Sequence, residues 1–327
     1  MVYDYSRVAR VQARKRKNPL RKLTILSVYF FITTLGLYIV THAVASKRSD
    51  VNFLSPFAEP LQQVSESIQG ISTFFSSGLG DVVTQSLEDS TGDYSVYIKN
   101  MKTGEQYVYR EHEEYLAASL YKLWTMGAVY TKIEAGELKK TDRLSASIES
   151  LNNTFDIASE EAELSEGTIS KTIDEALEQM ITISHNYSAL LLTSKIKVSS
   201  TREFLTEYGL QESVVGADLP ITTAHDIGRY FELLYHKEIV SEIYSEEMLS
   251  RLKRQQLNDR IPKQLPDSIS VAHKTGELFG YKHDAGIVYA PKGDYVIVLL
   301  SDSKSPSGAA ERMAELSKNV YDYFERK

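Results

Sequence analysis

Three short groups of polar residues follow one another along this chain, and their residue types can carry out nucleophilic chemistry. They are Ser119-Leu120-Tyr121-Lys122, Ser184-His185-Asn186 and Lys274-Thr275-Gly276. A serine hydroxyl is a poor nucleophile until a base removes its proton. A lysine amine can be that base when burial or a neighbouring cation lowers its pKa. The S-x-x-K spacing of Ser119 and Lys122 puts both side chains on one face of a helix.

The order of the three groups is informative, because each group alone recurs elsewhere in the chain. Ser194 and Ser301 also begin an S-x-x-K pattern, and Lys102-Thr103-Gly104 is a second K-T-G. The second K-T-G lies between two strand-like runs, which predicts a hairpin turn. Ser301 ends an apolar run, which is typical of a strand end. These repeats are therefore not candidates for the reactive site.

The second group follows one predicted helix and precedes another. A loop in that position can present a hydroxyl and an amide in a cleft, where Ser184 would relay a proton to a leaving nitrogen. Asn186 would hold an amide of the substrate. The competing interpretation is an ordinary turn between helices, in which the same side chains cap a helix end.

The third group opens out of a predicted strand and offers groups that bind anions. Lys274 and Thr275 can bind a substrate carboxylate through charge-assisted hydrogen bonds, and Gly276 lets a substrate backbone lie close to the strand. The backbone N–H groups of Ser119 and Glu277 can form an oxyanion hole. Lys274 would also supply the cation that lowers the pKa of the first lysine.

The histidines predict no metal site. The chain has seven of them, and none is spaced as H-x-H or H-E-x-x-H. There is no cysteine, so disulfides and thiolate chemistry are excluded. His185 and His283 come nearest to the predicted cleft, and we interpret them as structural.

Charge is distributed unevenly along the chain. Residues 1–50 contain ten Lys and Arg against two Asp, whereas the whole chain has a net charge of −7. The main body is therefore strongly acidic, which argues against nucleic acid as a partner.

The basic N-terminal stretch has a membrane explanation. Leu23–Ala45 contains no Asp, Glu, Lys or Arg, and an apolar run of that length spans a bilayer core of about 30 Å. Because Lys and Arg precede it, the positive-inside rule places the N-terminus in the cytoplasm and the rest outside the cell. The alternative is a signal peptide cleaved after Ala45, since Ala43-Val44-Ala45 resembles a cleavage site.

Four regions are predicted in the chain. They are a basic cytoplasmic tail at 1–22, a single transmembrane anchor at 23–45, an extracytoplasmic stalk at 46–79 and a folded domain at 80–327.

Within the folded domain, two strands come early, three come late and helices fill the middle. We expect an α+β fold, with one five-stranded antiparallel sheet flanked by helices and an inserted all-α subdomain. The expected strands are Tyr94–Asn100, Gln106–Arg110, Ile269–His273, His283–Tyr289 and Tyr295–Ser301. The expected helices are Asp81–Glu88, Leu120–Ala135, Thr172–Ile183, Ser188–Lys195, Thr201–Tyr208, Ala224–Tyr235 and Gly308–Glu325.

With these residues in order, the domain resembles the class A β-lactamases and the related penicillin-binding serine hydrolases. The segments that carry the resemblance are Tyr115–Leu123, Met180–Asn186, Thr222–Asp226 and Gly286–Tyr289, besides the K-T-G. The resemblance implies a serine acyl-enzyme and a substrate with a carboxylate beside an acylable amide. The substrate would be a β-lactam or a peptidoglycan stem peptide, and no cofactor is implied.

Two departures from the family pattern stand out. His185 replaces the aspartate of S-D-N, a modest change because the catalytic groups flank it. The E-x-x-L-N segment, whose glutamate activates the deacylating water, is missing. The acidic residues between Asn186 and Thr222 are Glu203, Glu207, Glu212 and Asp218, none of them in that setting. We therefore expect acylation to be retained and β-lactam hydrolysis to be slow.

Two classes of function remain open. The first is a membrane-anchored hydrolase of β-lactams or of D-Ala-D-Ala-type amides and esters in the cell wall. The second is a non-catalytic penicillin- or wall-binding sensor or scaffold. Loss of catalytic residues would favour the second class. In this chain all the residues of the three groups are present.

Overall fold

The computed structural model of the chain describes residues 77–216 and 219–327. Within these ranges, no helix combines the length and apolar character needed to cross a bilayer. The predicted tail and anchor, residues 1–22 and 23–45, lie outside the described residues. Helix α3 (Ser77–Leu87) begins before Gly80, where the sequence placed the start of the domain, and its Leu79 is fully buried.

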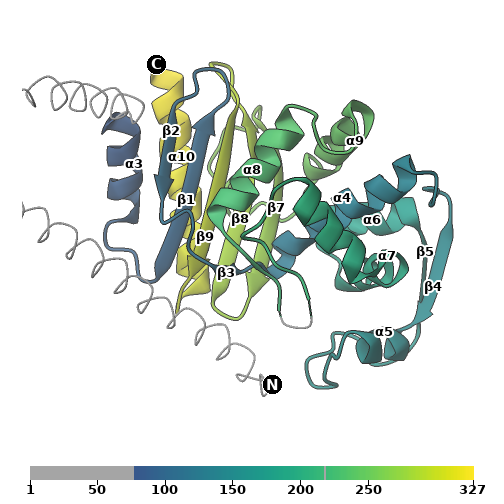
Figure 1. The fold of residues 1–327 in the computed structure, drawn as a ribbon. Helices are drawn as coiled ribbons and strands as arrows, with labels where there is room; N and C mark the ends of the chain where they lie inside the picture. The colour runs from purple at the N-terminus through teal and green to yellow at the C-terminus, as the bar shows by residue number, and fades with distance from the viewer. Residues whose placement is uncertain (1–76, 217–218) are drawn as a thin grey trace, which may run out of the picture. The chain divides into compact units, whose positions relative to one another are not determined.

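A five-stranded antiparallel sheet is assembled from both ends of the domain, as the sequence predicted (Figure 1). Its strand order is β2-β1-β9-β8-β7. The register pairs Val96 with Leu299 and Gly286 with Ile297. The strands are β1 (Asp93–Asn100), β2 (Gln106–Tyr109), β7 (Ser270–Leu278), β8 (Tyr281–Tyr289) and β9 (Tyr295–Asp302).

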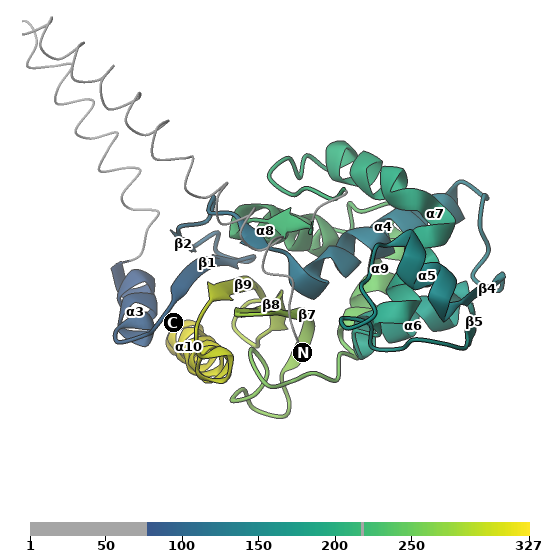
Figure 2. The same ribbon diagram turned by 90° about the horizontal axis from the view of Figure 1, so that it is seen from below.

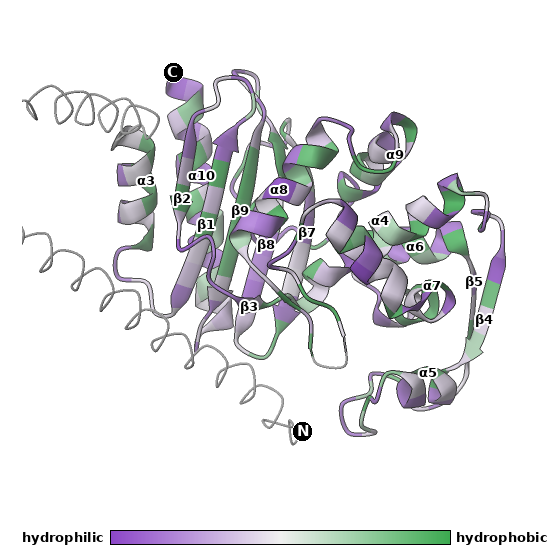
Figure 3. Cartoon of the chain, viewed as in Figure 1, coloured by the Kyte–Doolittle hydropathy of each residue, from purple (hydrophilic) through white to green (hydrophobic). Residues whose placement is uncertain are grey.

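Helices cover both faces of this sheet. The view along the sheet shows α8 (Ala224–Tyr235) on one face, with α3 and α10 (Pro306–Arg326) on the other (Figure 2). The apolar sequence of β9 makes it the most uniformly hydrophobic strand, green along most of its length in Figure 3. Strand β9 lies between the helices of the two faces. On one face, its Ile297 and Leu299 belong to the same buried cluster as Val320 of α10. This cluster packs α3 and α10 against one face of the sheet.

The middle of the chain forms a helical insertion beside β7. Its helices are α4 (Tyr121–Glu134), α5 (Ile148–Thr154), α6 (Ile173–Thr182), α7 (Asn186–Glu207) and α9 (Glu242–Leu252). The sequence predicted α4, α6 and α8 nearly to their ends. It divided α7 into two helices, and the structure has a break inside that helix at Lys197, whose φ is 66° and ψ 152°.

The insertion is not all-α, which corrects the sequence prediction. It contains an antiparallel pair, β4 (Arg143–Ser147) with β5 (Thr168–Thr172). A second small pair, β3 (Tyr115–Leu116) with β6 (Ile221–Thr222), joins two loops beside the sheet. Both pairs are short and α9 has a mixed pattern, so none of them gave a periodic signal strong enough to predict.

Candidate active site

Ser119 lies at the end of a tightly held segment. It follows β3 and sits in the 3-10 helix η1 (Ala118–Leu120), which runs directly into α4. The imidazole of His283 links β3 to the sheet. Its Nδ1 accepts from Ser301 N–H at 3.2 Å, so its Nε2 carries the proton and donates to Leu116 O at 2.8 Å. Ala118 has a φ of 45°, a strained value for a residue with a Cβ. Such strain is common where a reactive side chain must be aimed.

Lys122 lies one turn further, on α4, and is fully buried. Its Nζ is 2.6 Å from Ser184 O, 3.1 Å from Ser184 Oγ and 2.6 Å from Asn186 Oδ1. Burial lowers the pKa of Lys122 to about 7, and the charge of Glu163 acts in the opposite direction. A lysine with that pKa is partly neutral at physiological pH, as a general base requires.

The hydroxyl of Ser184 lies between two lysines. Lys274 Nζ is 3.1 Å from Ser184 Oγ, the same distance as Lys122 Nζ. Ser184 reaches this position with a φ of 56°, in the left-handed region that residues with a Cβ rarely occupy. When Lys122 is neutral, Ser184 O–H can donate to it while accepting from Lys274. The three groups therefore form a continuous path for a proton.

Lys274 is itself fully buried on β7. Burial lowers its pKa well below the usual value, and the charge of Lys122 lowers it further. Its ammonium also donates to Thr275 O at 2.8 Å. Two buried amines so close favour a state in which only one of them is charged.

The S-x-N loop places two side chains with different tasks. Asn186 Oδ1 accepts from Lys122, and its Nδ2 donates to Glu163. His185 is the N-cap of α7, where its Nδ1 accepts from Ser188 N–H at 3.0 Å. The aspartate expected at this position would make a similar cap. The first turn of α7 is therefore capped with histidine at this position as well.

The K-T-G strand passes close to the start of α4. A Cβ on Gly276 would lie 3.2 Å from Ala117 O and 3.3 Å from Leu120 Cγ. A larger residue would push β7 away from the nucleophile. Glu277 ends this stretch, and its carboxylate pairs with Arg260 and Lys282 rather than with the groups above. A contribution of Glu277 through its backbone N–H is unaffected by those pairs.

The structure thus brings together the side chains of Lys122, Ser184, Asn186 and Lys274. Ser119 differs from the expectation, because among the described residues its hydroxyl has no hydrogen-bond partner. Lys122 donates to the S-x-N loop instead. Catalytic hydrogen bonds are often absent before substrate binds and form in the complex.

Sequence reasoning missed Glu163. It lies in the loop between α5 and β5, and that loop is tied down next to it: Leu164 N donates to Tyr187 Oη at 3.1 Å, and Asn152 Nδ2 donates to Leu164 O at 2.9 Å. No spacing relates Glu163 to the three groups. The loop is brought to the site by its contacts with Asn152 and with Tyr187, which is buried in the first turn of α7.

The other acidic residues considered from the sequence lie elsewhere. Glu203 and Glu207 are exposed on α7, and Glu212 contacts His112 at 2.9 Å. Asp218 lies outside the described residues. The described residues of the loop between α7 and β6 therefore offer no deacylating carboxylate equivalent to that of E-x-x-L-N.

The domain matches one family model, described as the beta-lactamase enzyme family, over residues 79–324. That range covers most of the chain and contains all three residue groups. The chain belongs to the beta-lactamase enzyme family. Family membership makes it a serine hydrolase, as the sequence predicted.

Solved structures with the same fold include members of this family. A beta-lactamase from Sphaerobacter thermophilus DSM 20745 has a TM-score of 0.68 and 21% identity, covering 77% of this chain and 98% of that chain. The structure of PBP-A has a TM-score of 0.66 and 21% identity, and the match covers 76% of this chain and 96% of that chain. A representative of class A beta-lactamase from Bacteroides cellulosilyticus DSM 14838 has a TM-score of 0.65 and 19% identity, and the match covers 76% of this chain and 98% of that chain. None of the curated proteins matches the chain.

Proposed function

We propose that this chain is a membrane-anchored serine hydrolase that forms an acyl-enzyme at Ser119. Its substrates are β-lactams or the D-Ala-D-Ala-type amides and esters of the cell wall. The observation that carries the proposal is the Ser184 hydroxyl, held 3.1 Å from the amines of two buried lysines. That arrangement has a cost in burial and strain which a purely structural role does not require.

Acylation would proceed in two proton transfers. Ser119 Oγ attacks the substrate carbonyl and gives its proton to neutral Lys122, directly or through Ser184. The C–N bond then breaks, and Ser184 passes a proton to the leaving nitrogen and is reprotonated from Lys122. The carboxylate of the substrate would pair with Lys274 and Thr275. Backbone N–H groups of Ser119 and Glu277 would stabilise the oxyanion, a contribution worth about 10²–10³ in rate.

Deacylation would be slow, because the E-x-x-L-N glutamate has no counterpart in this chain. The carboxylate of Glu163 contacts the S-x-N loop, and it accepts a hydrogen bond from Asn186. One structural relative supports a long-lived adduct in this fold: a PBP-A mutant was solved as an acyl-enzyme complex with penicillin G. A lasting adduct favours cell-wall chemistry as the natural reaction.

The test is intact-mass measurement over time, with the full chain mixed with benzylpenicillin. We expect a stoichiometric adduct that persists in the wild-type chain and is absent from Ser119→Ala. Rapid loss of antibiotic without an adduct would show instead a true β-lactamase with another deacylating group. Absence of both adduct and antibiotic loss would contradict the proposal and favour a non-catalytic wall-binding module.

The membrane anchor is tested separately by fractionating cells that express the chain. We expect the protein in the membrane fraction and removal of Leu23–Ala45 to release it. A protein found only in the medium, beginning after Ala45, would show that the segment is a cleaved signal peptide.

A further inference from the structure

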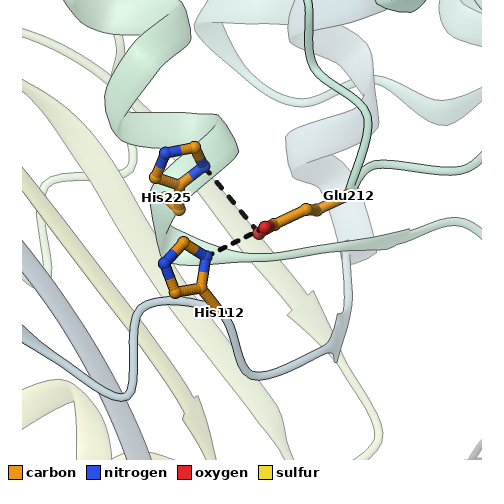
Figure 4. A group of neighbouring side chains, drawn as sticks. All are labelled: His112, Glu212 and His225. Carbon is orange, nitrogen blue, oxygen red and sulfur yellow. Dashed lines mark hydrogen bonds and ion pairs between the residues drawn. The ribbon is translucent and has the colours of Figure 1, made fainter.

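Three side chains from separate parts of the fold converge on one point beside the β3–β6 pair (Figure 4). His112 lies in the turn between β2 and β3, Glu212 lies between α7 and β6, and His225 is in the first turn of α8. Each offers one ligand atom, and these atoms lie within 4.8 Å of one another. His112 Nδ1 and His225 Nδ1 are 2.9 and 3.8 Å from the two carboxylate oxygens of Glu212.

Hydrogen bonds from neighbouring residues hold Glu212 and His225 in place. Thr223 Oγ1 donates to Glu212 Oε2 at 2.7 Å, and Glu212 N donates to Asp226 Oδ2 at 2.9 Å. His225 N donates to Glu111 O at 2.9 Å. The bond from Thr223 orients the carboxylate of Glu212, as hydrogen bonds to ligand groups do in protein metal sites. The other two bonds hold the backbone at Glu212 and His225. The third residue, His112, is exposed and can rotate.

The local charge also favours a cation. Besides Glu212, the carboxylate of Glu111 lies 3.5 Å from His112 Nε2, and that of Asp226 lies 3.4 Å from His225 Nδ1. Three carboxylates therefore surround two imidazoles. Imidazole with carboxylate is a donor set that suits zinc and its neighbours in the transition series.

We propose that His112, Glu212 and His225 bind a divalent transition-metal ion of the zinc type. In a tetrahedral zinc site with metal–ligand distances of about 2.0–2.1 Å, the ligand atoms lie about 3.3 Å from one another. The ligand atoms here lie within 4.8 Å of one another, so a small movement of His112 would bring them to that spacing. The fourth position would hold water. This proposal is independent of the proposed reaction at Ser119, and none of the three residues belongs to that site.

The ion would act as a clamp on the scaffold of the active site. It would join the turn that leads into β3, and so to Ser119, with the segment that leads into β6 and with α8. In the absence of metal, the contacts between these residues are hydrogen bonds, partly exposed ion pairs and a ring contact between His112 and His225, and exposed ion pairs contribute little stability. Metal binding that favours the folded state raises its melting temperature.

The experiment uses the untagged full chain, stripped of metal with a chelator and titrated with Zn²⁺ alone in a calorimeter. We expect one saturable equivalent per chain and a higher melting temperature. His112→Ala and His225→Ala should each weaken binding at least tenfold. Glu212→Gln should do the same, since it removes the charge and keeps the shape. Co²⁺ in place of Zn²⁺ should give visible absorption bands that these variants lose.

The matched control is His236→Ala, because His236 is exposed just beyond the other end of α8 and outside the cluster. It should bind Zn²⁺ like the wild type. Two results would overturn the proposal: no saturable binding, or binding that His112→Ala and His225→Ala leave unchanged. His112→Ala removes an exposed side chain, so its melting temperature without metal should match the wild type and keep the comparison valid.

Discussion

At the scale of single residues, the site depends on placing two lysines where water cannot solvate them. Lys122 and Lys274 are both fully buried and share the hydroxyl of Ser184. Burial is the main reason that both amines have lowered pKa values. The sequence predicted both lysines and Ser184 as site residues. It could not predict that the Ser184 hydroxyl contacts both amines, because that contact depends on the left-handed backbone of Ser184.

The titration of Lys122 gives the first prediction. Its pKa of about 7 means that the neutral, proton-accepting form appears as the pH rises through neutrality. The rate of acylation by benzylpenicillin should rise about tenfold per pH unit below 7 and level off above it. Stopped-flow or quenched-flow mass measurements from about pH 5.5 to about 8.5 would show this profile.

Lys122→Arg is the control for that profile, because arginine keeps the positive charge and does not lose its proton. Acylation should fall by about 10²–10⁴. A rate that is independent of pH in the wild type, or an active arginine variant, would contradict the role of Lys122 as base.

His185 gives a prediction about stability. Its Nδ1 accepts a backbone N–H, so the cap of α7 needs a neutral imidazole. Burial is the first cause that lowers the pKa of His185 below 6.5, followed by the charge of Lys171. The unfolded chain therefore takes up the proton more readily than the folded one, and stability from the cap is lost as the pH falls below 6.5 through the lower folded value.

The comparison for His185 is His185→Asn, which keeps a good cap and does not titrate. The wild type should lose about 1 kcal/mol more unfolding free energy than the variant between pH 7 and 5. Denaturant titrations at both pH values measure the difference, and equal losses would show that His185 does not control the helix end.

At the scale of elements, long periodic helices and the late strands were predictable, while elements held by tertiary contacts were not. Strand β7 extends through Lys274 and Gly276 because β8 continues beside it, whereas its sequence pattern suggested an end at His273. The loop carrying Glu163 is placed by Tyr187 and Asn152. Such long-range contacts leave no local pattern, and so Glu163 could not be assigned to the site.

The break in α7 is a prediction at this scale. Lys197 is exposed and has dihedral angles that only glycine adopts without strain. Lys197→Gly should raise the unfolding free energy by about 1 kcal/mol, which the denaturation midpoint would show. Lys195→Gly, also exposed but regularly helical, should lower it by about 1 kcal/mol. The same sign of change in both variants would contradict strain at Lys197.

At the scale of the whole molecule, the sheet joins the two ends of the domain, and α10 covers one of its faces. The sequence predicted this architecture because two strands precede and three follow the helical insertion. Phe324, near the end of α10, is 3% exposed and its ring lies 5.0 Å from that of Tyr295. The C-terminal helix is therefore part of the core.

Phe324→Ala should test that conclusion. We expect it to cost about 3–5 kcal/mol of unfolding free energy, as large-to-small changes in a core do. Arg326→Ala, on an exposed position of the same helix, should be close to neutral. Urea denaturation of both variants makes the comparison, and a neutral Phe324→Ala would show that α10 is dispensable for the fold.

The pairing of β1 with β9 also determines when the domain can fold. Strand β1 precedes the helical insertion in the chain, and its neighbour β9 follows it, so the ribosome makes the whole insertion between the two strands. Contacts between such distant segments close large loops and form slowly. A chain still growing on the ribosome has β1 and β2 but no strand to complete the sheet, and therefore no oriented Ser119. The protein should stay unfolded and open to proteases until translation has passed Asp302, and become active only after the whole domain has been released.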